Sequence, residues 1–398
     1  MVDYHPFSTA LHHDPWPIYR RLRDEAPAFY LPEFDCWFLS RFEDVWNACA
    51  DPRFVASGGV TTIELLLGQR YSAGGTALAV LDPPLHTQLR GRLAPFLLPR
   101  AARALEASTR ELAGRLLDEA LPRGELDVIH GLAMRVSVRV ACRILGLPLE
   151  DADLLAGNVN ASFDRDPDSP GQTAAGEAAG SLLRDYFAKW VAERRVRPHR
   201  DGVVERLLAF EVDGRPLSDE DLLSNLTLLV VGGTETLPKV FAGCVDRLAR
   251  HPEQRARVVA DPGLVPDAFW EALRVEMPTQ MLGRTLGEEV VLHGERLRPG
   301  QKAMFLWACA NRDEREFADP DRFDSLRRAP RILSFGHATH RCLGQHVARM
   351  EGRVLLEELL ARVPEYEVVL ERAVRIRSEF FRGFASLPIR FLPGPRAR

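Results

Sequence analysis

The chain has 398 residues, of which 46% are hydrophobic and 27% are charged, and its formal net charge is −4. This balance is typical of a soluble globular protein that can bury a large core. The negative net charge argues against nucleic acid as the main partner, because phosphate binding needs an excess or a stripe of basic residues.

The first helical pattern covers residues 14–23, where prolines lie near the start and apolar residues recur at 18, 19 and 22. Two short aromatic segments, 28–30 and 36–39, are separated by Pro32 and predict a hairpin. Most of the following sequence has a helical period. Helices are predicted at 101–121, 127–146, 150–163, 173–196, 218–250, 252–260 and 265–276.

Between 285 and 310, and again from 366 to 392, the pattern shortens to strands with glycine and proline turns. The loop-like stretch 164–172 lies between two helical patterns, so we interpret it as a connection within a domain. No internal repeat has a fixed period. We therefore expect one domain over residues 1–398, mainly α with a small β region.

The N-terminal residues 1–6 lack a charged start followed by an apolar run, and the longest apolar run, 226–231, is far too short to span a bilayer. We expect no signal peptide and no membrane partner. The six cysteines show no Cys-x-x-Cys spacing, which disfavours zinc and disulfides and fits the cytoplasm.

The strongest chemical signal is the run 335–344, Phe-Gly-His-Ala-Thr-His-Arg-Cys-Leu-Gly. Its cysteine, Cys342, is followed by an apolar helical pattern at 347, 350, 354 and 355, and amides at a helix start favour an anionic thiolate. A thiolate can serve as the axial ligand of haem iron. The alternative is a buried apolar cysteine, where most free cysteines are found.

The second signal is the run 231–236, Val-Gly-Gly-Thr-Glu-Thr, inside the longest predicted helix. Two interior glycines cost a helix about 1 kcal/mol each, and the close approach of a ligand would justify that cost. Pro238 cannot donate to the carbonyl of Thr234, so the helix should kink there, with Glu235 and Thr236 at the kink. The alternative is a packing defect in a core helix.

These runs resemble two signatures of the cytochrome P450 family: the haem loop Phe-Gly-x-Gly-x-His-x-Cys-x-Gly, matched except at Ala338, and the oxygen-binding groove. The resemblance extends from residue 14 to about 391 and implies a cytochrome P450-like fold. It implies that Cys342 binds haem iron, Thr236 steadies dioxygen and Glu235 feeds protons toward it. Ala338 must avoid positive φ or accept strain of about 1 kcal/mol or more.

Further fragments follow in family order. The resemblance places cofactor contacts at His86, Arg90, Arg284 and His340, with a loop built by Phe335, Gly336 and Gly344. A structural clamp under the thiolate loop would consist of Glu271, Arg274 and Arg322. The substrate pocket would include Leu228, Leu229, Gly232, Met281, Leu282, Phe381 and Phe384. Each charge, taken alone, has an ordinary alternative as a solvated surface group.

The resemblance implies a monooxygenase with haem b that inserts one atom of O2 into an apolar terpenoid, steroid or aromatic metabolite. Electrons would come indirectly from NAD(P)H through a separate ferredoxin or flavodoxin, docking near Arg341, Arg349 and Arg353. The alternatives are peroxide-driven oxidation, isomerisation or oxidative coupling, and a non-catalytic haem protein that binds a ligand. An alternative pocket chemistry is a carboxylate clamp made by Arg70, Tyr71 and Arg382.

Overall fold

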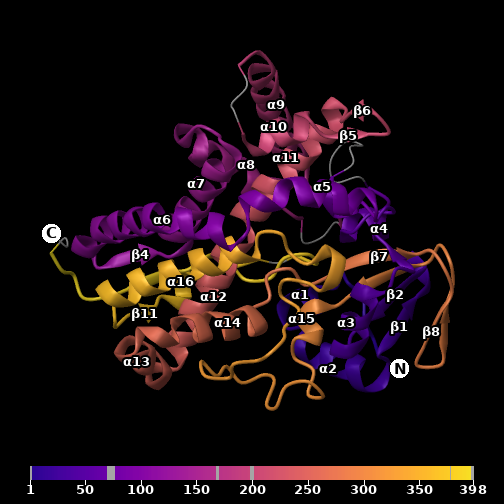
Figure 1. The fold of residues 1–398 in the computed structure, drawn as a ribbon. Coiled ribbons are helices and arrows are strands. Elements are labelled where there is room, and N and C mark those ends of the chain that lie inside the picture. The colour runs from indigo at the N-terminus through magenta and orange to yellow at the C-terminus, as the bar shows by residue number, and fades with distance from the viewer. Residues whose placement is uncertain (1, 70–76, 167–169, 198–200, 377, 396–398) are drawn as a thin grey trace.

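Helices make up most of the structure, and a five-stranded sheet lies near the N-terminus (Figure 1). The computed structural model describes residues 2–69, 77–166, 170–197, 201–376 and 378–395. The mainly α architecture with a small β region is the one that the sequence predicts.

Most of the longer helices lie within two residues of their predicted limits. The helices are α1 (Thr9–His13), α2 (Trp16–Glu25), α3 (Phe42–Ala50), α4 (Thr62–Leu67), α5 (Leu85–Leu93), α6 (Pro99–Ala120), α7 (Met134–Leu145), α8 (Ala152–Ser162), α9 (Ala174–Val196), α10 (Val203–Leu208), α11 (Asp219–Thr234), α12 (Thr236–Arg250), α13 (Pro252–Ala260), α14 (Val265–Val275), α15 (Trp307–Ala310) and α16 (Gln345–Arg362).

The strands are short. They are β1 (Ala28–Leu31), β2 (Cys36–Leu39), β3 (Phe54–Val55), β4 (Glu125–Asp127), β5 (Glu211–Val212), β6 (Arg215–Pro216), β7 (Leu282–Leu286), β8 (Val290–Leu292), β9 (Glu295–Leu297), β10 (Lys302–Phe305), β11 (Glu367–Val368), β12 (Val374–Arg375), β13 (Phe384–Ser386) and β14 (Pro388–Arg390).

The five-stranded sheet has the order β1-β2-β10-β7-β3. Strands β1 and β2 form the predicted antiparallel hairpin, with Ala28 opposite Leu39. Strand β10 then pairs in parallel with β2, and Lys302 lies opposite Cys36. The sheet therefore joins the beginning of the chain to a segment from its last third, as the neighbouring indigo and orange strands in Figure 1 show.

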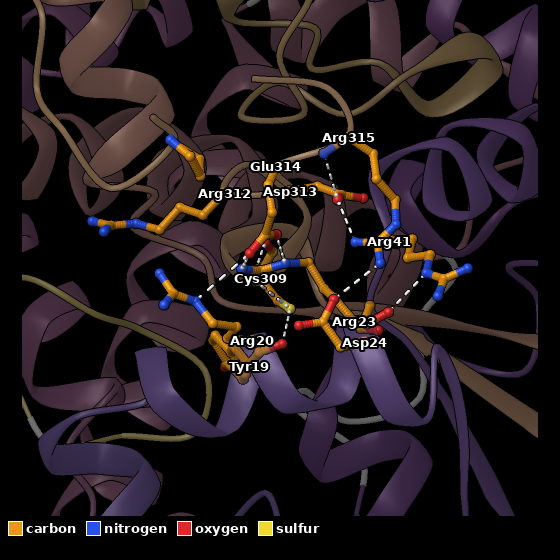
Figure 2. Close-up of polar contacts among 12 residues, drawn as sticks. Tyr19, Arg20, Arg23, Asp24, Arg41, Cys309, Arg312, Asp313, Glu314 and Arg315 are labelled. Atoms are coloured by element: carbon orange, nitrogen blue, oxygen red, sulfur yellow. Dashed lines mark hydrogen bonds and ion pairs between the residues drawn. The ribbon is translucent and has the colours of Figure 1, made fainter. Parts of the chain in front are cut away.

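Polar contacts connect helix α2 to α15 and to the segment that follows it (Figure 2). The buried guanidinium of Arg23 lies 2.8 Å from Glu314 and donates to the carbonyl of Cys309 at 3.2 Å. Arg315 pairs with Asp24 at 2.9 Å. Because Arg23 is buried, its charge needs these partners, so the Arg23 contacts hold α2 against the later segment, whereas the exposed Arg315–Asp24 pair adds little.

The predicted helix over 218–250 is divided into α11 and α12, and the break lies at Glu235. The break has the predicted cause, because Pro238 has no N–H for the carbonyl of Thr234 and its ring crowds that oxygen. The stretch Asp219–Arg250 is the one candidate membrane span in the described residues by length and composition. Its apolar 18-residue window is 67% buried inside the protein, as in a core helix.

Candidate active site

The thiolate loop, residues 335–344, is closed by a hydrogen bond from the amide of Cys342 to the carbonyl of Phe335, at 2.7 Å. Gly336 has a φ of +64°, which glycine adopts without strain. Gly344 is the N-cap of α16, and the amides of Gly344 and Gln345 point at the sulfur. The predicted approach of helix amides to the cysteine is therefore present.

Cys342 is exposed, whereas the other five cysteines are buried or half-buried. The surrounding protein desolvates the thiolate and raises the pKa of Cys342, and the Gly344 and Gln345 amides with Arg90 and Arg341 oppose that rise. Cys342 is thus an exposed residue whose sulfur has both amides and cations beside it.

Ala338 has a φ of +54°, inside a single turn of 3-10 helix over Ala338–His340. Of the two alternatives drawn from the sequence, the structure has the strained one. A non-glycine residue in this left-handed region costs about 1–2 kcal/mol.

Four basic side chains converge beside the thiolate loop from α5, β7 and the loop itself. The rings of His86 and His340 have centroids 4.2 Å apart. Arg90 donates to the carbonyl of Arg341 at 2.7 Å, and the buried Arg284 donates to its neighbour's carbonyl. The sequence predicts this grouping, although the four residues are spread over more than 250 positions.

The electrostatics of this basic cluster suit an anionic group. Burial, together with the charges of Arg284, His86 and Arg90, lowers the pKa of His340 to about 3. Nδ1 of His86 is buried and has no hydrogen-bond partner within the described part of the chain. A ligand with carboxylates would satisfy such donors and relieve the repulsion between the cations.

The two glycines before the helix break differ in their surroundings. Gly232 is exposed, and a Cβ built on it would meet no atom within 4 Å. A Cβ on Gly233 would lie 3.1 Å from that of Ala141, so Gly233 allows α11 to approach α7. The sequence-based explanation by ligand approach therefore suits Gly232 and is wrong for Gly233. Thr236 lies one turn from Gly232, on the same open face.

Glu235 does not lie free beside the break. Its carboxylate contacts the ammonium of Lys239, which also donates to the carbonyl oxygen of Glu235 at 2.9 Å. Glu235 is 3% exposed and Lys239 is 6% exposed. The sequence interpretation missed Lys239, although a Glu and a Lys four residues apart in a helix are the usual signal of such a pair.

The structural clamp contains a different third arginine from the one predicted. Glu271 and Arg274 form a buried ion pair at 2.7 Å. The other guanidinium on Glu271 belongs to Arg327, at 2.9 Å. Arg322 is exposed, and what it gives to the clamp is its carbonyl, which accepts from Arg274 at 3.3 Å. The choice of Arg322 was wrong because the chain turns after it and brings Arg327 inward.

Two of the expected pocket residues belong to the hydrophobic core. Met281 is 0% exposed and Phe384 is 2% exposed, so neither presents surface to a ligand. Leu282, the first residue of β7, is half-buried. Leu228 and Leu229 are half-buried.

An aromatic group closes the same region. Phe381 is buried under Phe163, whose ring centroid is 4.7 Å away at the end of α8. Of the alternative carboxylate clamp, Arg70 and Tyr71 lie outside the described residues. The guanidinium of Arg382 packs 4.9 Å from the ring of Trp16, and burial lowers its pKa.

The expected basic docking surface is smaller than predicted. Arg353 is paired with Glu106 at 2.7 Å and with Glu357 at 3.0 Å, so its charge is largely compensated. Arg341 and Arg349 remain exposed and border a groove of about 480 Å³ beside the thiolate loop. The groove is lined by residues that include Trp46, Trp270, Phe335 and His337.

The comparisons with known proteins agree with this geometry. The family model "Cytochrome P450" matches residues 263–388. The chain is 35% identical to the "Putative cytochrome P450 123" of Mycobacterium tuberculosis over 385 residues, 96% of each protein. It is 32% identical to the "Vitamin D(3) 25-hydroxylase" of Pseudonocardia autotrophica, over 98% of this chain and 96% of that protein. The crystal structure of CalO2 superposes with a TM-score of 0.87 at 30% identity, over 99% of this chain and 100% of that one.

Proposed function

The chain belongs to the cytochrome P450 family of haem-iron monooxygenases that use O2, and we propose that it inserts one oxygen atom into a compact apolar substrate. The observation that carries this proposal is the exposed residue Cys342 at the start of α16, beside four basic side chains. A cytoplasmic location is part of the proposal.

We propose haem b as the cofactor, with the Cys342 thiolate as the axial ligand. His86, Arg90, Arg284 and His340 would bind its two carboxylates; the unpartnered Nδ1 of His86 and the mutual repulsion in the basic cluster support this role. When bound, the haem supplies the O2-activating chemistry, which thiolate ligation favours.

Thr236 and Glu235 would deliver protons at the helix break. Thr236 lies one helical turn after Gly232, which leaves that face open, and Glu235 is the adjacent acid. A positioned acid that hands a proton through a hydroxyl or water contributes about 10²–10⁴-fold to a rate. Peroxide-driven oxidation has no need of such a relay, so the presence of both residues favours the O2-dependent reaction.

The surroundings of this face favour an apolar substrate. Leu228, Leu229 and Leu282 are half-buried aliphatic side chains, and Phe381 closes the region. Arg382, the described member of the alternative carboxylate clamp, packs against Trp16. Affinity would then come from apolar burial at about 25 cal/mol per Å². The similarity to a vitamin D3 hydroxylase supports a terpenoid or steroid, and an aromatic metabolite also fits this chemistry.

Bacterial relatives need redox partners. We propose that a ferredoxin or flavodoxin delivers the electrons, which come indirectly from NAD(P)H. Arg341 and Arg349, beside the tryptophan-lined groove, would attract the acidic donor. Reduction of the protein by this donor should therefore slow as the salt concentration rises, since salt screens the attraction between exposed charges.

The test combines binding and turnover. Neutral terpenoids and steroids, paired with matched carboxylic acids, are screened for shifts of the Soret band, and the best ligand is turned over with NADPH, ferredoxin, reductase and isotope-labelled O2. We expect shifts with the neutral compounds and one labelled oxygen atom per product. Shifts confined to the acids would overturn the apolar substrate, and turnover supported by peroxide but not by O2 would overturn the monooxygenase.

A further inference from the structure

Lys239 is a buried cation one helical turn after the proposed proton donor. Its Nζ contacts the Glu235 carboxylate and donates to the Glu235 carbonyl at 2.9 Å. Burying an ammonium costs several kcal/mol unless it is paired, so the exact placement of Lys239 beside an acid calls for a reason.

Close packing around Lys239 holds its side chain against Glu235. The ring of Phe381 lies 4.9 Å from Nζ, and a Cβ on Gly383 would be 3.1 Å from the Cβ of Lys239. Burial lowers the pKa of Lys239, and the charge of Glu235 opposes that effect. The ammonium is thus closely packed, and desolvation makes it a better proton donor than a lysine in water.

We propose that Lys239 is a positioning residue that holds the Glu235 carboxylate at the helix break and supplies the proton that Glu235 passes on. This inference rests on the proposed role of Glu235 in proton delivery. A proton moves from Nζ to Oε1, which converts the ion pair into a neutral amine and a carboxylic acid. The acid then gives its proton to Thr236 or to water on the open face, and the amine regains one from solvent.

The first transfer is suited to a buried site. It converts two opposite charges into two neutral groups, so no net charge is created where water is scarce. Without Lys239, burial would favour the neutral form of the Glu235 carboxyl, and no neighbouring group would replace the proton that it gives away. If Lys239 only held Glu235 in place, any cation at this position would serve. If Lys239 supplies a proton, the cation must be one that can lose its proton.

Two substitutions separate these roles. Lys239→Met removes the charge at similar length, and Lys239→Arg keeps the charge but cannot lose its proton. We expect both to lower product formed per electron by about tenfold or more, with the remaining electrons released as peroxide. Lys189→Met, at an exposed position of α9, is the matched control and should behave as wild type.

An infrared spectrum of the resting protein gives a readout independent of turnover. Lys239→Met should show a new carboxylic acid band that disappears in the Lys239→Met/Glu235→Gln double variant, whereas Lys239→Arg should show none. Absence of this band in Lys239→Met, or wild-type product per electron in Lys239→Arg, would overturn the inference. If Glu235→Gln and Thr236→Ala also leave product per electron unchanged, the proposed proton relay itself fails.

Discussion

The guanidinium of Arg327 lies 2.9 Å from the Glu271 carboxylate, which it shares with Arg274. Glu271 is buried, so its charge depends on both arginines. The pair connects α14 to the segment that leads to the thiolate loop. The third member of the clamp is therefore defined by a turn of the chain and not by its position in a short motif.

Arg327→Leu should lower the free energy of unfolding by about 3 kcal/mol, because it removes one cation from a buried carboxylate. The exposed Arg322 keeps its carbonyl contact in any variant, so Arg322→Leu should unfold close to wild type. Urea unfolding of the two proteins checks this difference. Equal losses in both variants would contradict the assignment of Arg327.

Cys342→Ala should abolish the long-wavelength Soret band of the reduced CO complex, because that band requires a thiolate ligand. Cys309→Ala is the control: its thiol contacts Tyr19 and Arg23 beside α2, and the band should remain. A normal band in Cys342→Ala would refute the assignment of the axial ligand.

Ala338→Gly should stabilise the protein by about 1 kcal/mol, since glycine adopts a φ of +54° without the steric cost that alanine has. The matched control is Ala79→Gly in the 3-10 turn Leu78–Val80, where φ is negative and glycine should destabilise instead. Thermal unfolding of both variants measures the effect. A loss of stability in Ala338→Gly would show that the loop carries no strain at this residue.

Glu351 makes stability depend on pH. Its carboxyl, buried in α16, accepts a hydrogen bond from Ser137 at 2.7 Å, and burial raises the pKa of Glu351 to about 8. The folded state therefore binds this proton more tightly than the unfolded chain, where the pKa is near 4.5. The resulting stabilisation is fully present below pH 4.5 and is lost as pH rises through about 8, by up to about 1.4 kcal/mol per pH unit.

Glu351→Gln should remove most of this slope and be more stable than wild type at pH 8 by about 1–3 kcal/mol. Glu111→Gln, at an exposed position of α6, is the control and should keep the wild-type slope. Unfolding free energies across pH 5 to 9 check the sign, and a wild-type stability that rises over this range would contradict it.

Local patterns in the sequence predict much of this molecule. Periodicity gives the long helices, Pro238 gives the break, and the thiolate loop gives the sulfur at a helix start. The short helices α3, α4 and α10 were missed because six to nine residues show too little periodicity to distinguish a helix from a loop.

The errors concern tertiary contacts. Whether Arg322 or Arg327 reaches Glu271 depends on how the intervening turn folds, and the burial of Met281 depends on how the segment before β7 packs against the core. Lys239 is different, because its spacing from Glu235 was visible in the sequence. A Glu and a Lys four residues apart in a helix are usually interpreted as a surface pair. The burial of Glu235 and Lys239 depends on the segments that cover them, which the local pattern does not show.

The parallel pairing of β2 with β10 also has a consequence for synthesis of the chain. Strand β2 is an apolar segment, Cys36–Leu39, whose partner Lys302–Phe305 is made some 260 residues later. At about 5–20 residues per second, the ribosome leaves this edge unpaired for roughly 15 to 50 seconds. An unpaired apolar edge is a site of association between chains, so slower translation or release of truncated chains should favour aggregation of the nascent protein.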